Sequence, residues 1–487
     1  MSDLSRQAGL LTLADFVRFS IKTLIGIALA RILSPADLGT YRQLFLIYGT
    51  LSGILLLGFP QSLLYYIPKS DDPEKTKRLI SRTLHVVSFL AVLCALIIFC
   101  SRSFIAHSFN NPDLQYLLIP YSIYPLLLFV TQMYSSILLG LKQPLKSATF
   151  SIFAISCDFV LVLGSALIFR DMRYIVAALI VSALLQWLWA EWGLRSLKAG
   201  WSLQNYAGFK EQLAYTIPLG LSLLVGVLSV QLDKLMISGF FKPEEFAVFS
   251  LGALELPLIG ILINSVNAVL LPNMSSSSKA DMAAIFSASV RKNSIIVFPL
   301  ATVFFIFATE FMFVIYGAIY VSSALYFKVY LLILPLRVAT YGLVFQALGK
   351  TKLVMLDSLI MLILNVILNY ILIRTFGMVG AAIATVIVSW FIVLVYLFQM
   401  RYCMGLKLLD MFPLQSILTN LCAALLPVFV VVPVSGLIPN SFLRMTLGGT
   451  IYMLLYYGIA RILRVIKPYD LELGRSIISG ILKRGRK

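Results

Sequence analysis

Three charged side chains lie on one stripe of the first apolar segment of this chain. Asp15, Arg18 and Lys22 are spaced by three and four residues, so on an α-helix their side chains leave from one face. Each such charge costs roughly 2.5–3.5 kcal/mol to place at the centre of a membrane helix. A membrane helix that keeps this stripe is expected to expose it to water, to a partner charge or to a charged ligand.

The membrane premise rests on composition and on the length of the apolar runs. The chain has 487 residues, of which 60% are hydrophobic and 12% are charged. A soluble chain would carry about twice that charged fraction, and runs long enough to cross a bilayer recur from end to end. The runs are unbroken rather than alternating, which favours helices over a β-barrel. We therefore expect an all-α integral membrane protein.

The apolar runs predict the number and orientation of the membrane spans. We expect about fourteen transmembrane helices. Their approximate ranges are 8–31, 43–66, 79–101, 114–140, 147–170, 173–196, 213–240, 246–271, 292–316, 325–348, 353–375, 379–400, 416–434 and 443–465. Most of the 39 Lys and Arg residues fall in alternate connections and in the tail, which places both termini in the cytoplasm. Topology accounts for the net charge of +18, so no nucleic-acid partner is expected.

Two distant stretches of the sequence resemble each other with one constant offset. Residues 30–41 read ARILSPADLGTY, and residues 238–249, which lie 208 positions further on, read SGFFKPEEFAVF. The same offset aligns LGLK with ALGK, so that Lys142 stands opposite Lys350. One offset that holds at two distant places indicates an internal repeat.

The repeat predicts the domain organisation. We expect two six-helix halves, 1–196 and 213–400, which are related by an axis along the membrane normal and surround a central cleft. Two further helices and a basic cytoplasmic tail follow in 401–487. Parallel repeats of this kind place the substrate site between the halves.

Four basic side chains lie within the expected spans: Arg18, Lys22, Lys234 and Arg337. Arg18 and Lys22 are near the middle of the first helix, and Arg337 is near the middle of the tenth. Ionisable groups inside a membrane usually face a water-filled cavity or a ligand pathway. We expect these residues to line the cleft and to bind something anionic.

Acidic residues in the same layer leave a second interpretation open. Asp15, Asp158 and Asp233 are candidates for ion coupling or for structural pairing. Buried pairs can hold helices in register without any substrate. The structural alternative consists of these pairs: Asp15 with Arg18, Asp233 with Lys234, and Asp158 with Arg337.

Other polar residues have structural explanations. Glu191 stands four residues before Arg195, which predicts an ion pair. Asn365 and Asn369 share one helix face, which predicts helix–helix hydrogen bonds. The sequence contains no phosphate loop, metal-binding cluster or nucleophile–base motif. We therefore expect no metal, no cofactor and no enzymatic activity, and a secondary transporter is the natural class.

Three stretches resemble one family. Residues 29–69 (LARILSPADLGTYRQLFLIYGTLSGILLLGFPQSLLYYIPK), residues 231–252 (QLDKLMISGFFKPEEFAVFSLG) and residues 364–387 (LNVILNYILIRTFGMVGAAIATVI) are similar to bacterial polysaccharide-biosynthesis flippases. These are the O-antigen or capsule-type members of the multidrug/oligosaccharidyl-lipid/polysaccharide exporter superfamily. The third stretch is shared across the whole superfamily, and the last two helices match nothing diagnostic.

The resemblance implies a function and a set of partners. It suggests that the chain moves undecaprenyl-diphosphate-linked oligosaccharide repeat units from the inner to the outer leaflet of the bacterial cytoplasmic membrane by alternating access. Arg18, Lys22, Arg337 and Lys234 would then bind the diphosphate. Membrane lipid and a polysaccharide polymerase are further expected partners, and we expect a monomer.

Two alternatives belong to other functional classes. A multidrug cation antiporter of the same superfamily, driven by protons or sodium, needs unpaired acids deep in its cavity. The deepest charges here are largely basic. A membrane glycan polymerase or ligase needs a large outer loop to build a catalytic surface, and the outer loops expected here are short.

Overall fold

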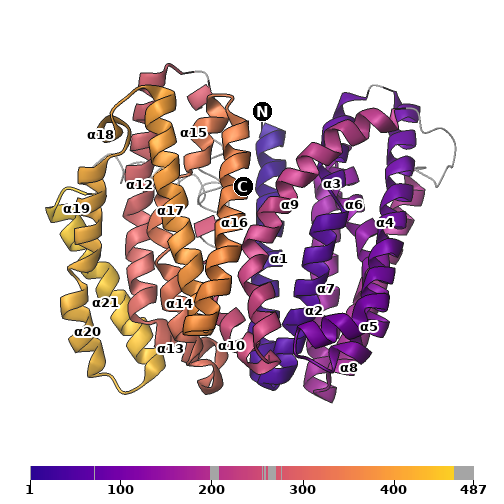
Figure 1. Cartoon of the computed structure of the whole chain (residues 1–487), viewed down its shortest axis with the longest axis horizontal. Helices are drawn as coiled ribbons and strands as arrows, with labels where there is room; N and C mark the ends of the chain where they lie inside the picture. Colours follow the sequence, from indigo (N-terminus) through magenta and orange to yellow (C-terminus); the bar gives the residue numbers. More distant parts are fainter. Residues whose placement is uncertain are drawn as a thin grey trace. The chain divides into compact units, whose positions relative to one another are not determined.

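The computed structural model describes residues 2–70, 72–197, 208–254, 256, 259–260, 270–271, 273–275 and 277–465. Helices and their connections make up this part of the chain, and it contains no strand. The all-α class is therefore confirmed. The chain forms two compact units, Met1–Ser250 and Leu251–Lys487, and each is a bundle of long helices (Figure 1).

The first unit begins several of its helices with proline. Pro35, Pro73 and Pro144 each occupy the start of a long helix, where the missing N–H of proline costs no hydrogen bond. In chain order the helices are α1 (Ser2–Ile32), α2 (Pro35–Leu55), α3 (Phe59–Tyr66), α4 (Pro73–Ser108), α5 (Leu114–Tyr121), α6 (Tyr124–Gly140), α7 (Pro144–Phe169), α8 (Met172–Ser196), α9 (Phe209–Phe240) and α10 (Pro243–Gly252).

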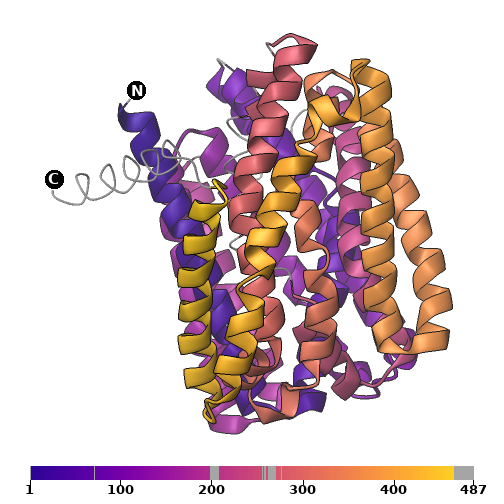
Figure 2. The ribbon, with the colours of Figure 1, turned by 90° about the vertical axis from the view of Figure 1, so that its left-hand side faces the viewer.

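The second unit contains a tight hairpin of two long helices. Its helices are α12 (Lys279–Ile306), α13 (Ala308–Tyr316), α14 (Ser323–Leu331), α15 (Tyr341–Ala347), α16 (Thr351–Phe376), α17 (Met378–Met404), α18 (Leu408–Met411), α19 (Leu414–Leu425), α20 (Val428–Gly436) and α21 (Ser441–Ile462). Gly377, with a φ of 63°, joins α16 to α17. A Cβ at Gly380 would collide with the Leu372 carbonyl. The last helices pack on α12 and α13 (Figures 1 and 2).

Fewer helices meet the criterion of length and composition for a membrane span than the fourteen that the sequence predicts. Within the described residues, 9 helices are long and apolar enough to cross a membrane, or up to 11 if two bent pairs each count as one span. These pairs are α2 with α3, bent by 49°, and α5 with α6, bent by 47°. Leu57 and Gly58, with φ angles of 42° and 81°, make the first bend. The expected range 246–271 lies partly outside the described residues, and the count of fourteen stays a prediction.

Two helices that the predicted repeat aligns begin with the two complementary halves of a capping box. At the start of α2 the Asp37 N–H donates to Ser34 Oγ at 3.1 Å. At the start of α10 the Lys242 N–H donates to Glu245 Oε2 at 3.0 Å. In both cases a polar side chain satisfies an N–H group at the helix start, directly around the proline.

The turns that end α6 and α15 also correspond, but in a different register. Lys142, with a φ of 58°, occupies the left-handed position after α6, and Gly349, with a φ of 70°, occupies it after α15. Each turn closes with a hydrogen bond from the next residue back across the turn. The left-handed residue is thus Lys142 itself in the first turn and the residue before Lys350 in the second, and the repeat stays a prediction.

Candidate functional site

The charged stripe of α1 is exposed over its whole length. The Arg18 guanidinium lies 3.3 Å from Asp15 Oδ1, and the two side chains are 56% and 66% exposed. Lys22 follows one turn later and is also exposed. It stands ten residues before the end of α1 at Ile32, which is about 15 Å along the helix. Among the described residues, α1 does not meet the criterion of length and composition for crossing a membrane, so a mid-membrane depth for Arg18 and Lys22 stays a prediction.

Asp158 on α7 faces the same region of the first unit. Its Oδ1 accepts a hydrogen bond from Ser182 Oγ at 2.6 Å and another from Gln186 Nε2 at 3.1 Å. Both donors belong to α8, and α7 also packs along α1. The Lys22 ammonium lies within electrostatic range of the carboxylate. The first unit therefore brings together Lys22 and Asp158, two candidates that the sequence places in different helices.

Asp233 and Lys234 sit in the last third of α9. Asp233 is buried, and its Oδ1 accepts the backbone N–H of Lys234 at 2.7 Å. The contact that joins these neighbours therefore involves the lysine backbone. The Lys234 side chain is half-buried.

Arg337 lies where a membrane span of the second unit is broken. Residues Ser323–Ala347 form one span by length and composition, but the chain passes through a 3-10 segment, Leu334–Val338, and an extended residue at Ala339. The Val338 carbonyl that the break frees accepts a hydrogen bond from Asn293 Nδ2 at 3.0 Å. The Arg337 side chain is exposed at this break. Its expected alternative pairing with Asp158 would join the two units and stays a prediction.

Sequence reasoning missed a buried polar cluster that ties the start of α9 to α3 and α4. Gln212 of α9 is 1% exposed. Its Oε1 accepts from Arg82 Nη2 at 3.0 Å, and its Nε2 donates to Thr83 Oγ1 at 2.8 Å and to Ser62 Oγ at 3.2 Å. One glutamine thus satisfies side chains from two other helices. The available signal was a lone glutamine at the edge of an apolar run.

A second cluster ties the other end of α9 to α2. Gln43 Nε2 donates to Ser238 Oγ at 2.8 Å, and Gln43 Oε1 accepts from Asn111 Nδ2 at 2.6 Å. A Cβ at Gly39 would collide with the Pro243 carbonyl just after α9. The first unit therefore holds α9 at both ends by buried hydrogen bonds and close backbone contact.

The pairs expected from helical spacing have mixed outcomes. Arg195 Nε lies 3.0 Å from Glu191 Oε1, so that ion pair is confirmed. Asn369 Nδ2 donates to the Asn365 backbone carbonyl at 2.9 Å and to the Asn365 side chain. The expected hydrogen bonds to another helix are replaced here by bonds within α16.

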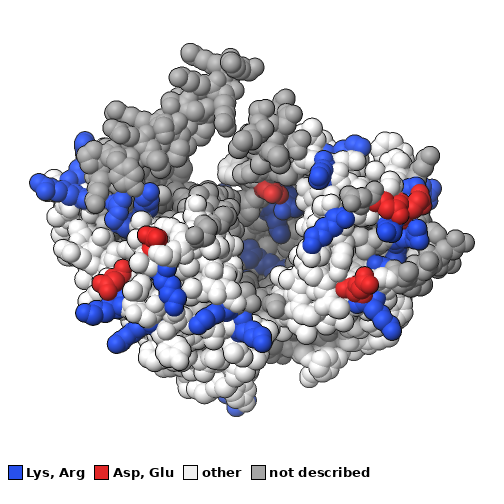
Figure 3. Space-filling view, turned by 90° about the horizontal axis from the view of Figure 1, so that it is seen from above, with Lys and Arg blue, Asp and Glu red and all other residues white. Residues whose placement is uncertain are grey.

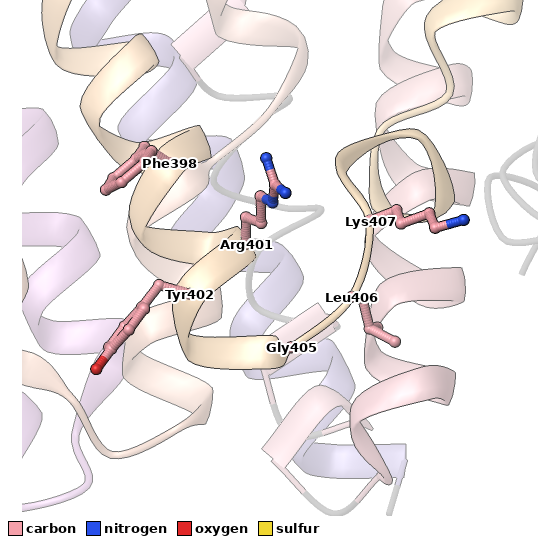
Figure 4. A pocket seen from close by; sticks show the side chains of 6 residues that line it. All are labelled: Phe398, Arg401, Tyr402, Gly405, Leu406 and Lys407. Atoms are coloured by element: carbon pink, nitrogen blue, oxygen red, sulfur yellow. The ribbon is translucent and has the colours of Figure 1, made fainter.

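A shallow cavity of about 430 Å³ lies where α17 meets α18. Its lining residues are Phe398, Arg401, Tyr402, Gly405, Leu406 and Lys407. Figure 4 shows the Arg401 and Lys407 side chains on different segments, with their charged ends pointing apart. Two cations that do not converge make a weak phosphate site, so the α1 stripe of the first unit and, separately, Arg337 of the second unit remain the candidate residues.

Figure 3 shows Lys and Arg side chains spread over one face of the described surface, with Asp and Glu side chains among them. Within the residues that the structure describes, no group of three His, Cys, Asp or Glu side chains is placed to hold a metal ion.

Comparison with known proteins identifies the family. Residues 4–278, more than half of the chain, match the family described as polysaccharide biosynthesis protein. A capsular polysaccharide biosynthesis protein, CapF of Staphylococcus aureus, is 27% identical over 205 residues. That match covers 40% of this chain and 52% of CapF, so the chain spans about half the length of this curated relative.

Solved structures share the fold at low sequence identity. A lipid II flippase MurJ in an inward closed conformation matches with a TM-score of 0.77 and 16% identity, over 93% of this chain and 98% of that one. An inward-facing multidrug resistance MATE family transporter of the MOP superfamily matches with a TM-score of 0.55 and 17% identity, over 80% and 94%. The chain is a multi-pass membrane protein with the fold of these transporters, and it belongs to the polysaccharide biosynthesis protein family.

Proposed function

We propose that this chain is a flippase for undecaprenyl-diphosphate-linked oligosaccharide repeat units, which it moves from the inner to the outer leaflet of the bacterial cytoplasmic membrane. Family membership supports a role in polysaccharide biosynthesis, and the shared fold supports transport. Alternating access of the two predicted halves is the proposed mechanism, with both termini in the cytoplasm.

The observation that carries this proposal is the exposed cationic stripe on α1. A diphosphate is anionic, Arg binds phosphate oxygens through a planar fork, and Lys binds them as a point charge. Arg18 and Lys22 supply one of each on one helix face. Arg337, exposed at the broken span of the second unit, and Lys234 on α9 are the proposed additional contacts.

The partners of these cations can give way to a ligand. An exposed ion pair such as that of Arg18 with Asp15 contributes only about 0–1 kcal/mol. A charged hydrogen bond to phosphate, at about 1.5–3 kcal/mol, therefore outcompetes it. Asp15, Asp158 and Asp233 take the role of counter-charges, and ion coupling through them, a monomeric state and a contact with a polysaccharide polymerase belong to the same proposal.

A multidrug cation antiporter is the competing function on the same fold. It requires an acid that is available to a cationic substrate. Asp158 already has two hydrogen-bond donors and Lys22 beside it, and Asp15 lies against Arg18. These surroundings favour an anionic substrate.

A leaflet-resolved assay tests the proposal. The gene is deleted, and lipid-linked oligosaccharide is quantified on the inner and outer faces of the membrane after complementation with variants. Wild type should relieve inner-leaflet accumulation. Arg18→Ala, Lys22→Ala and Arg337→Ala should each lower the delivery rate about tenfold or more, as expected for one lost charged contact.

Arg102→Ala is the matched control, because Arg102 lies near the end of α4 and stacks on Phe99 of its own helix. It should restore delivery fully. Normal outer-leaflet delivery without the gene, in a strain that has no second flippase, would remove the function. Full rescue by each of Arg18→Ala, Lys22→Ala and Arg337→Ala would keep the proposed function and discard the proposed site.

A further inference from the structure

Asp357 on α16 and Gln399 on α17 form an isolated polar pair in the second unit. Gln399 Nε2 donates to Asp357 Oδ1 at 2.7 Å, and the Asp357 side chain is fully buried. The second carboxyl oxygen of Asp357 and the amide oxygen of Gln399 are both buried and accept no hydrogen bond. Two unsatisfied acceptor oxygens therefore belong to one hydrogen-bonded pair.

An ionised Asp357 fits this arrangement poorly. A buried polar group without a hydrogen bond costs about 1–3 kcal/mol, and a charged one costs more. The part of the chain that the structure describes places no Lys or Arg in an ion pair with Asp357. A carboxylate here would keep one oxygen unsatisfied and a charge uncompensated.

A protonated Asp357 resolves both deficits with one hydrogen atom. A proton on Oδ2 turns that oxygen into a donor, and the neighbouring Gln399 Oε1 is the acceptor that lacks a partner. Together with the bond already present from Nε2 to Oδ1, this closes a ring of two antiparallel hydrogen bonds between a carboxylic acid and an amide. Every polar atom of the pair is then satisfied.

The titratable and charged groups around the pair leave this chemistry undisturbed. Tyr396 on α17 lies within electrostatic range of Asp357, and its ring stacks parallel to Tyr341 of α15 with centroids 6.1 Å apart. Lys350 Nζ contacts Cys403 Sγ at 3.3 Å, and Lys279 Nζ donates to the Cys403 carbonyl at 3.1 Å. Lys352 lies at the start of α16. Lys350 and Lys279 make these contacts at the end of the hairpin, and within the described residues none of the three lysines forms an ion pair with Asp357.

We propose that Asp357 and Gln399 form a proton-binding site that holds one proton at neutral pH and joins α16 to α17. The proton comes from water at the start of α16, six residues or about 9 Å from Asp357 along the helix. Release of the proton converts the acid to a carboxylate, removes the bond to Gln399 Oε1 and weakens the hairpin. The proposal does not depend on the identity of the transported substrate.

Infrared spectroscopy of the full-length protein in lipid nanodiscs tests the protonation state directly. Wild type at neutral pH should show the C=O stretch of a protonated carboxylic acid, with a shift in D₂O. Asp357→Asn should lose this band. Asp158→Asn should keep it, because this variant changes the Asp–Gln pair of the other hairpin and leaves Asp357 and Gln399 intact.

Thermal unfolding against pH gives an independent reading. The folded protein holds this proton and the unfolded chain releases it at neutral pH, so the stabilisation is present at lower pH and is lost as pH rises through the titration of the site. Wild type should therefore lose thermal stability toward alkaline pH. Asp357→Asn should lose less over the same range, since an amide at this position can still donate to Gln399 Oε1.

Two results would overturn the proposal. One is a protonated-carboxyl band of equal intensity in wild type and Asp357→Asn. The other is an absent band together with a specific salt effect. In that case NaCl raises the thermal midpoint of wild type, choline chloride leaves it unchanged, and NaCl no longer raises the midpoint of Asp357→Asn. The second outcome would make the pair a sodium site.

Discussion

The α7–α8 hairpin of the first unit and the α16–α17 hairpin of the second carry the same pair of side-chain types. In each, an aspartate on the first helix accepts a hydrogen bond from a glutamine on the second. The distance is 3.1 Å from Gln186 to Asp158 and 2.7 Å from Gln399 to Asp357. The two hairpins are also counterparts in the predicted repeat, as fifth and sixth against eleventh and twelfth spans.

The surroundings of the two acids differ. Asp158 accepts a second bond from Ser182 and has the exposed Lys22 within electrostatic range, which suits a carboxylate. Asp357 is fully buried, has one donor and leaves an oxygen unsatisfied, which suits a neutral acid. An Asp–Gln pair on adjacent helices therefore does not define a charge state. The remaining donors, the nearby cations and the burial of the acid define it.

Removal of the two glutamine amides should give the largest difference between the hairpins. Gln399→Leu takes away the donor to Asp357 Oδ1 and the proposed acceptor for the proton on Oδ2, and should destabilise the protein by about 1–3 kcal/mol. Gln186→Leu leaves Asp158 with the 2.6 Å bond from Ser182, so the loss of stability should be smaller, about 1 kcal/mol. Thermal midpoints in lipid nanodiscs measure both. Equal losses of stability would contradict this difference, because the two acids would then depend equally on their glutamines.

The coupling between Lys22 and Asp158 should be smaller and should exist only in the first unit. Lys22→Met should lower the thermal midpoint in the wild-type background and leave it unchanged when Asp158 is already Asn. A double-mutant cycle of these variants should give a coupling of roughly 0.2–1 kcal/mol, as is typical of exposed charges. The matched cycle of Lys350→Met with Asp357→Asn should give none. A coupling at Lys350 would show that the buried acid is charged.

The sequence predicts local pairs far better than pairs between helices. Helical spacing alone placed Glu191 against Arg195, and the alternative pairing of Asp15 with Arg18 is present in the structure. Both pairs lie within one turn of a single helix, so their distance follows from the helix geometry. The all-α class followed equally directly from the apolar runs.

Contacts between helices depend on rotation and depth that the sequence does not encode locally. Gln399 lies 42 residues from Asp357, and nothing in either segment shows that the two face each other. The Gln212 cluster joins residues 130 and 150 apart for the same reason. The turns after α6 and α15 place different residue types, Lys142 and Gly349, in the left-handed position, which the sequence pattern alone did not predict.

The smallest stability effect is expected at the exposed pair on α1, which makes it the reference for both buried acids. Arg18→Ala removes an ion pair whose two side chains are more than half exposed. The shift in thermal midpoint should therefore correspond to no more than about 1 kcal/mol in the free energy of unfolding. Its effect on transport should be large, since Arg18 is a proposed diphosphate contact. For the thermal midpoint, Asp15→Asn is the matched control, because it breaks the same pair and keeps the cation. A stability loss at Arg18 as large as that of Gln399→Leu would assign Arg18 a structural role and would remove the contrast between an exposed, substrate-facing stripe and a buried proton-holding pair.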